Sequence, residues 1–185
     1  MEGRRLSNNS TTAGYLTSTG PPPLYDEALE REISRWIRAV SGLPAKTVFP
    51  RMTDPQTQIP QNGTTWCGFS ISDFNQDAYP ALVAGEGSSQ QWDHEGLSIL
   101  CCFYGPAGQQ TATRFRAGIF VSQNNDELKR IGLTLWQCGK MYNVPELINN
   151  QWVRRYDITV SLRRKVIREY GIKSLTSAPV KFFGE

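Results

Sequence analysis

The stretch WVRRYDITVSLRR, residues 152–164, decides how the chain is interpreted, because hydrophobic and polar residues alternate along it. One parity holds Trp152, Tyr156, Ile158, Val160 and Leu162. The other parity holds Arg155, Asp157, Thr159, Ser161 and Arg163. A period of two is that of a β-strand with one buried and one solvent-exposed face, whereas a helix would spread these arginines around its circumference. The pattern therefore predicts a sheet that displays most of its basic residues to solvent.

Other segments supply strands to go with it. WCGFSISDF (66–74) alternates in the same way, which predicts a half-buried strand. LSILCCFYG (97–105) is apolar at both parities, as expected for a central strand. We predict that AGEGSSQQ (84–91) is the loop of a long hairpin joining these two, and that residues 133–141 form a further strand. A short strand fits residues 47–49.

Two amphipathic helices and one short helix are expected. Residues 24–41 place apolar side chains on one helical stripe, and Gly42 and Pro44 end it. Gly105-Pro106 is expected to open a helix that continues to about Ser122. Its predicted buried face consists of Ala112, Phe115, Ile119 and Phe120. Asn124 or Asn125 suits the N-cap of a short third helix that begins with Asp126 and Glu127.

These elements predict an α+β fold: a mainly antiparallel mixed sheet of about four strands, flanked by two or three helices. A length of 185 residues suits one domain. Residues 1–22 are rich in Ser, Thr, Asn and Gly and are predicted to form a flexible arm, with a single domain over 23–185. The N-terminus lacks the apolar core of a signal peptide, and no apolar run approaches the roughly 20 residues that span a bilayer.

Charge and cysteine content narrow the function classes. Residues 1–150 carry a net charge of −2 and residues 151–185 carry +5, so the basic character is local. That distribution argues against a protein that coats nucleic acid along its whole surface. The cysteines, Cys67, Cys101, Cys102 and Cys138, have neither metal-site spacing nor the pattern of a disulfide framework. We expect reduced, structural cysteines and synthesis in a reducing cytoplasm.

A search for catalytic, cofactor and metal sites leaves no candidate. The single histidine, His94, lies in Asp93-His94-Glu95, where a strand would turn both carboxylates away from the imidazole. Gly85-x-Gly87 lacks the third glycine of a dinucleotide fingerprint, and no phosphate-binding GxxxxGK[ST] loop exists. We therefore predict no catalytic, cofactor-binding or metal-binding residues and no enzymatic activity.

The arginines leave two interpretations open. Trp152 and Tyr156 could stack bases while nearby arginines hold phosphates, as in single-strand-binding sheets. However, these aromatic residues share the apolar parity, whereas a stacking surface needs aromatic and basic residues on the same exposed face. Ion pairs with acidic protein partners are the favoured alternative, since arginine binds carboxylates bidentately.

The order and spacing of several short motifs resemble those of the neck (tail) terminator family of tailed bacteriophages. These motifs are Phe103-Tyr104-Gly105-Pro106, Gln123-Asn124, Val144-Pro145-Glu146-Leu147, Trp152-x-x-Arg155-x-Asp157, Leu162-Arg163-Arg164, Arg168-x-Tyr170 and Ser177-Ala178. The resemblance runs from about Leu29 to Val180 and is strongest after Phe103. The family pattern has a basic residue after Gln-Asn where this chain has Asn125, so no interface contact is carried over to that position.

The resemblance implies a structural virion protein with a small α/β domain. Such proteins form a ring, usually a homohexamer, that caps the tail tube and joins it to the neck below the head. The implied partners are further copies of the chain, the tail tube protein and the neck or connector protein, with transient, non-specific contact to passing genomic DNA. The implied location is the tail–neck junction of the virion. We expect Arg154, Arg155, Arg163, Arg164 and Arg168 to form subunit or tube contacts, opposite the acidic surface that residues 1–150 supply.

Three alternatives remain open from the residues. The closest is a head-completion or connector adaptor on the other side of the same joint. A basic single-strand nucleic-acid-binding module comes next, and salt-sensitive DNA binding with a definite site size would favour it. An enzyme would require an activity that is lost when His94 is changed.

Overall fold

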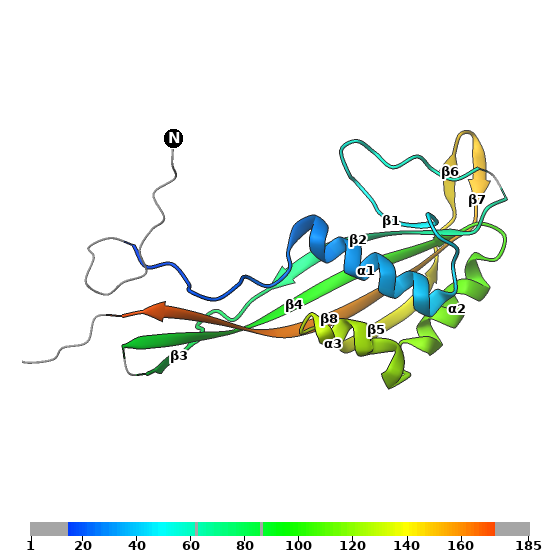
Figure 1. The fold of residues 1–185 in the computed structure, drawn as a ribbon. Helices are drawn as coiled ribbons and strands as arrows, with labels where there is room; N and C mark the ends of the chain where they lie inside the picture. The colour runs from blue at the N-terminus through cyan, green and yellow to red at the C-terminus, as the bar shows by residue number, and fades with distance from the viewer. Residues whose placement is uncertain (1–14, 62, 86, 173–185) are drawn as a thin grey trace, which may run out of the picture. The chain divides into compact units, whose positions relative to one another are not determined.

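The computed structural model describes residues 15–61, 63–85 and 87–172, and within them the fold is α+β (Figure 1). A mixed sheet of six strands has the order β1-β2-β4-β8-β5, with β3 paired to β4 outside this path. Its strands are β1 (Val48–Pro50), β2 (Trp66–Asn75), β3 (Ala81–Ala84), β4 (Ser88–Tyr104), β5 (Thr134–Asn143) and β8 (Arg155–Gly171). A separate hairpin joins β6 (Glu146–Ile148) to β7 (Gln151–Val153). The helices are α1 (Asp26–Ser41), α2 (Gly108–Gly118) and α3 (Asp126–Arg130), with a 3₁₀ turn, η1 (Ser122–Asn125), before α3.

The predicted fold class is confirmed, but the count of about four strands was too low. The sheet contains two additional short strands, β1 and β3, with three and four residues. Strand β1 is parallel to β2, whereas β2 and β3 pair antiparallel with β4, and β5 pairs antiparallel with β8. Contacts between β4 and β8 also run antiparallel, because Arg155 meets Cys102 whereas Arg164 meets Glu95.

The chain divides into two compact units. The larger consists of Pro23–Gln76 and His94–Lys165, and the smaller of Met1–Pro22, Asp77–Asp93 and Val166–Glu185. Strands β4 and β8 contribute residues to both units. The predicted boundaries, an arm over 1–22 and one domain over 23–185, stay a prediction.

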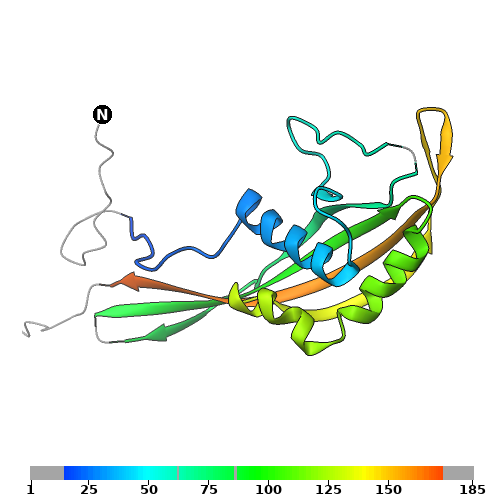
Figure 2. The same cartoon turned by 45° about the vertical axis from the view of Figure 1, so that its right-hand side comes forward.

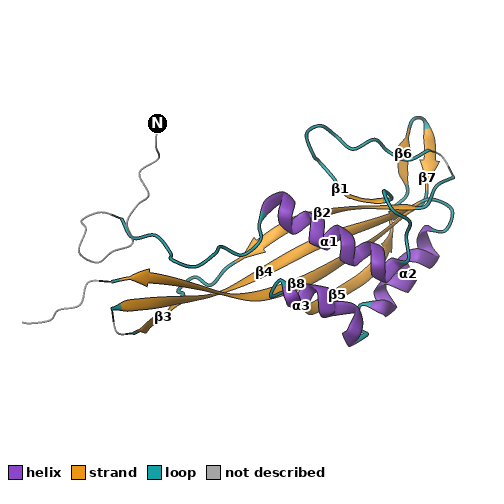
Figure 3. Cartoon of the chain, viewed as in Figure 1, coloured by secondary structure: helices purple, strands orange, loops and turns teal. Residues whose placement is uncertain are grey.

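In the larger unit, all three α-helices cover one face of the sheet (Figures 2 and 3). The buried stripe of α1 contains Leu29, Ile33, Trp36 and Ile37, and it packs against alternate residues of β2, β4 and β8. The indole of Trp36 meets Phe115 of α2 edge-on, with ring centroids 5.3 Å apart. This amphipathic packing, rather than intrinsic propensity, supplies most of the stability of such helices.

Asn125 is a buried structural residue. The Trp36 Nε1–H donates to its Oδ1 over 3.1 Å, and its own side-chain amide donates to the Ile119 carbonyl over 2.7 Å. It therefore ties α1 to the turn before α3, and its side chain faces the interior rather than a partner.

The predicted second helix was too long at both ends. Helix α2 ends at Gly118, where a Cβ would lie 2.6 Å from Val40 Cγ1 of α1. The backbone N–H groups of Phe120 and Val121 then donate to carbonyls three residues earlier, as in a tight turn. Ala112, Phe115 and Ile119 are buried as predicted, but Phe120 is 61% exposed, so its assignment to the buried face was wrong. Periodicity alone does not reveal the close helix crossing that ends α2 early.

The predicted loop over 84–91 was also too long. Strand β4 begins at Ser88, and the tight turn before it closes the β3–β4 hairpin, with Gly85 N–H donating to Ser88 O over 2.8 Å. Residues 88–91 are polar, which favoured a loop, but pairing with β3 makes them the first residues of β4. The strand predicted at 133–141 is confirmed as β5, and the short strand at 47–49 as β1.

Residues 15–22 contain no helix or strand, and the Thr19 N–H donates to the Glu169 carbonyl over 2.9 Å. Residues 1–14 of the predicted arm lie outside the described residues. In the described part of the chain, no helix is long and apolar enough to cross a membrane.

Candidate interface: the arginines of strand β8

The five candidate arginines occupy four kinds of environment. Arg154 and Arg163 are exposed. Arg155 is mostly enclosed by a polar cluster on the face of the sheet opposite the helices. Arg164 is buried on the helix-covered face, and Arg168 is partly buried in the smaller unit.

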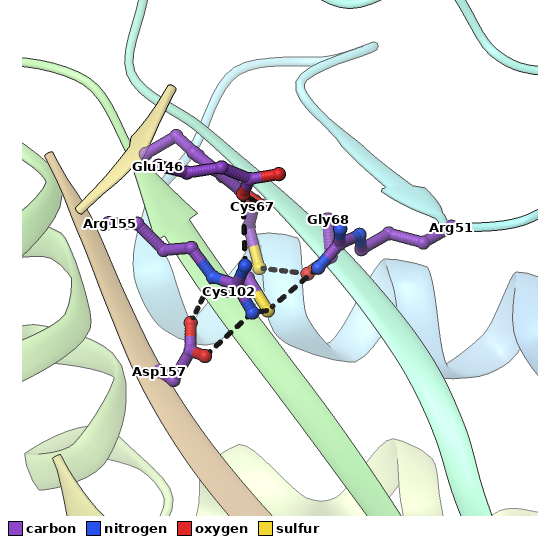
Figure 4. Close-up of polar contacts among 8 residues, drawn as sticks. Arg51, Cys67, Gly68, Cys102, Glu146, Arg155 and Asp157 are labelled. Atoms are coloured by element: carbon purple, nitrogen blue, oxygen red, sulfur yellow. Dashed lines mark hydrogen bonds and ion pairs between the residues drawn. The ribbon is translucent and has the colours of Figure 1, made fainter. Parts of the chain in front are cut away.

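Arg155 is the centre of the first cluster (Figure 4). Its Nε and Nη2 donate to the two carboxylate oxygens of Asp157, each over 2.7 Å, and its Nη1 donates to Glu146 Oε2 over 2.9 Å. Its side chain is 16% exposed. Such a bidentate arginine–carboxylate pair is among the stronger protein hydrogen-bonding arrangements. Because Glu146 lies on β6, Arg155 fastens the β6–β7 hairpin to the sheet.

Stacked aromatic rings adjoin this cluster. Tyr104 donates its hydroxyl proton to Glu146 Oε2 over 2.7 Å, and its ring stacks on Trp66 with centroids 4.0 Å apart. Phe49 extends the stack on the other side of Trp66, at 5.2 Å. The guanidinium of Arg51 contacts Cys102 Sγ at 3.4 Å, as does Arg155 Nη2.

The cluster shifts the pKa of several members. Burial acts to raise the pKa of Glu146, but the hydrogen bonds from Tyr104 and Arg155 outweigh it and hold that pKa below its ordinary value. Burial and the hydrogen bond to Glu146 raise the pKa of the Tyr104 hydroxyl. Burial and the neighbouring Asp157 charge raise the pKa of the Cys102 thiol to about 11. Glu146 is thus charged and the Cys102 thiol is protonated near neutral pH, as expected for a structural network.

The second buried arginine, Arg164, forms an ion pair with Glu95 of β4. Its Nε donates to Glu95 Oε2 over 2.8 Å, its Nη1 donates to the Leu24 carbonyl over 2.8 Å, and its Nη2 lies 2.7 Å from Oε2 without hydrogen-bond alignment. The two side chains are 2% and 1% exposed. Tyr25 places its ring under the guanidinium at 4.6 Å and donates its hydroxyl proton to Glu95 Oε1 over 2.6 Å. This site holds the start of α1 against the sheet.

Within the smaller unit, Arg168 pairs with Asp93 at 3.4 Å. Asp93 also accepts the backbone N–H of Asp77 over 3.2 Å. Tyr170 donates to Gln91 over 3.3 Å, so this end of β8 is linked to β4 by polar side chains.

The prediction that this strand has one solvent-exposed face, which displays most of its basic residues, was therefore wrong for several of the residues. Asp157 is buried and Arg155 is largely enclosed. Arg164 lies on the helix-covered face, as do Tyr156, Ile158, Val160 and Leu162. Trp152, assigned to the buried parity, is 74% exposed because it belongs to the β6–β7 hairpin and not to β8. The interface role of the five arginines stays a proposal, and only Arg154 and Arg163 present an exposed cation for it.

The partners of these arginines were missed, although a signal existed. Asp93 and Glu95 have the same parity as the apolar residues Leu97, Ile99 and Cys101. Likewise, Arg164 and Arg168 have the same parity as Ile158, Val160 and Leu162. Opposite charges that continue two apolar stripes indicate buried ion pairs between strands. No comparable pattern links Glu146 or Tyr104 to Arg155.

The remaining sequence candidates are placed as follows. His94 is exposed between the buried Asp93 and Glu95, as strand geometry predicted. All four cysteines are free thiols, and Cys67, Cys101 and Cys102 are buried. Over residues 15–61, 63–85 and 87–172, no three His, Cys, Asp or Glu side chains form a group that could hold a metal ion.

Residues 27–185 match the family model described as phage neck terminator protein. No curated protein matches the chain.

Proposed function

The chain belongs to the phage neck terminator protein family, and we propose that it forms a ring that caps the tail tube and joins the tail to the neck. Membership makes it a structural protein of the phage neck, located in the virion and associated with other virion proteins. The family is one of structural proteins, not of enzymes. The proposal adds a homohexameric ring, the tail tube protein and the neck or connector protein as partners, transient contact with passing DNA, and synthesis in the host cytoplasm. The observation that carries it is the family match over residues 27–185.

Exposed apolar side chains on the larger unit support an assembly role. Phe120, Trp136, Tyr142 and Trp152 are each more than half exposed. Aromatic residues are enriched at protein interfaces, where their burial contributes much of the binding energy. Strand β5, which bears Trp136 and Tyr142, ends the strand order of the sheet, so its outer backbone groups can pair with a neighbouring chain.

Arg154 and Arg163 are the proposed polar contacts. Arg163 lies opposite Thr134 of β5 in the strand register, which places it beside this edge of the sheet. A heterologous ring interface joins two unlike surfaces of the same protomer, and exposed arginines suit the acidic counterpart. In this proposal Arg155, Arg164 and Arg168 stabilise the protomer that presents these contacts.

The test is electron microscopy of particles from a phage that carries an early stop codon in this gene. Full heads beside unattached tails of irregular length would support a terminator, and supplying the protein from a plasmid should restore joined particles. Heads that fail to retain DNA, with tails of normal length, would favour the connector alternative. Normal, attached tails would refute the structural role at the joint.

A further inference from the structure

A preformed groove lies between the loop that follows β1 and the β6–β7 hairpin. It has a volume of about 460 Å³, and its lining includes Ile59 of the loop, Trp152 of the hairpin, and Trp66 and Pro106. Figure 1 shows the loop and the hairpin rising at the same end of the helix-covered sheet. All lining residues belong to the larger unit.

Close packing and hydrogen bonds hold parts of the groove lining in place. Gly105 has φ +94°, and a Cβ there would lie 2.3 Å from the Thr64 carbonyl oxygen, so the two backbones touch. The Gly105 N–H donates to the Arg154 carbonyl over 3.2 Å. The hairpin wall is fixed by the Glu146 bonds to Arg155 and Tyr104. A groove held open in this way loses little entropy when it binds a ligand.

The lining defines the chemistry of an occupant. It is mostly apolar and aromatic, and Trp152 is 74% exposed beside it. The only charged residue among the described lining residues is Arg154, whose guanidinium has no ion-pair partner in the described part of the chain. The complementary ligand is an extended segment with bulky apolar side chains and a carboxylate close behind them.

The segment 173–185, KSLTSAPVKFFGE, has this chemistry. It supplies the adjacent pair Phe182-Phe183 and, two residues later, Glu185. The other terminal segment, residues 1–14, has no aromatic residue and contains Arg4 and Arg5, which repel Arg154.

Length allows this segment to reach another subunit. Thirteen residues span up to about 43 Å when extended. A subunit in direct contact with the end of β8, where this segment begins, lies within that reach.

We propose that residues 173–185 of one copy bind in this groove of a second copy, with Phe182-Phe183 between Ile59 and Trp152 and Glu185 paired with Arg154. The inference rests on the proposed ring only for the proximity of the second copy. The segment then links neighbouring subunits through a swapped arm.

Disulfide trapping between full-length chains tests the proposal. Gln61→Cys places a thiol on the groove, and Gly184→Cys places one between Phe183 and Glu185 without removing either. A size-tagged Gln61→Cys chain is mixed with an untagged Gly184→Cys chain, oxidised glutathione is added, and mixed dimers are followed on non-reducing gels. The matched control is Gln137→Cys, an exposed glutamine on β5 away from the groove.

We expect the Gln61→Cys pair to form mixed dimers at least about tenfold faster than the Gln137→Cys pair, because binding raises the effective concentration of the thiols. Phe182→Ala with Phe183→Ala should remove this difference. Arg154→Glu should slow trapping, and adding Glu185→Arg to the other chain should restore it. Recovery of trapping after this charge exchange would identify Arg154 and Glu185 as an ion pair, because a variant that had lost its fold would not recover.

Two outcomes would overturn the proposal. Equal trapping of Gln61→Cys and Gln137→Cys would show random collision. A Gln61→Cys/Gly184→Cys chain that cross-links only to itself, at every concentration, would place the segment in its own groove. Both readouts use purified protein, so they are independent of the particle phenotype that tests the proposed function.

Discussion

Replacing Arg164 with Met should strongly destabilise the larger unit. The substitution keeps most of the side-chain volume but leaves Glu95, which is 1% exposed, without its positive partner. It also leaves the Leu24 carbonyl without the Arg164 hydrogen bond and removes the cation from the Tyr25 ring. Breaking one half of a buried ion pair costs about 3–5 kcal/mol of unfolding free energy.

That loss corresponds to a large thermal shift. For a protein of 150–250 residues, each kcal/mol lowers Tm by about 2–4 °C, so the expected decrease is about 6–20 °C. Circular dichroism at 222 nm is a suitable probe, because all three α-helices of the described chain lie in the larger unit. Urea titration measures the free energy directly.

Arg163→Met is the matched control, since the neighbouring arginine is exposed. It should change the unfolding free energy by no more than about 0.5 kcal/mol. Combining Arg164→Met with Glu95→Gln should recover part of the loss, because an uncharged amide can still accept the Tyr25 hydroxyl proton. A folded Arg164→Met protein within about 1 kcal/mol of wild type would refute the structural role of this pair.

Three further predictions address assembly, thiol chemistry and pH. Arg163→Glu should reduce the yield of joined particles while changing the unfolding free energy by less than about 0.5 kcal/mol; wild-type plaque yields would exclude Arg163 from the interface. Burial raises the pKa of the Cys102 thiol to about 11 and also raises the pKa of the half-buried Cys138 thiol. The thiols of the native protein should therefore react slowly with Ellman's reagent at pH 8, whereas all four should react in denaturant. Rapid reaction of the native protein would contradict this. Because the folded pKa of Glu146 is lowered, its stabilisation is present above the ordinary glutamate pKa of about 4.3 and is lost as pH falls through the folded value. Tm should therefore decrease less between pH 7 and pH 3 in Glu146→Gln than in wild type, and parallel profiles would count against this role.

Local pattern was sufficient to predict the main elements. Helix α1, strands β2, β5 and β8, and the central part of β4 follow from periodicity in the residues that form them. The elements that were missed or misjudged in length depend on neighbours distant in sequence. Strand β3 (Ala81–Ala84) pairs with the polar first residues of β4, and α2 ends where Gly118 meets Val40.

The sequence by itself determined the α+β class, the alternation of β8, the structural character of the cysteines and, through the order of its motifs, the phage neck terminator family. Only the tertiary structure decided which arginines remain exposed. Arg164 finds Glu95 across 69 positions of sequence, and Arg155 finds Glu146 on a hairpin outside the sheet. Sequence parity determines on which side of a strand a residue lies, but strand order and register determine what lies there. An arginine is solvated or buried according to whether that register brings a carboxylate within reach.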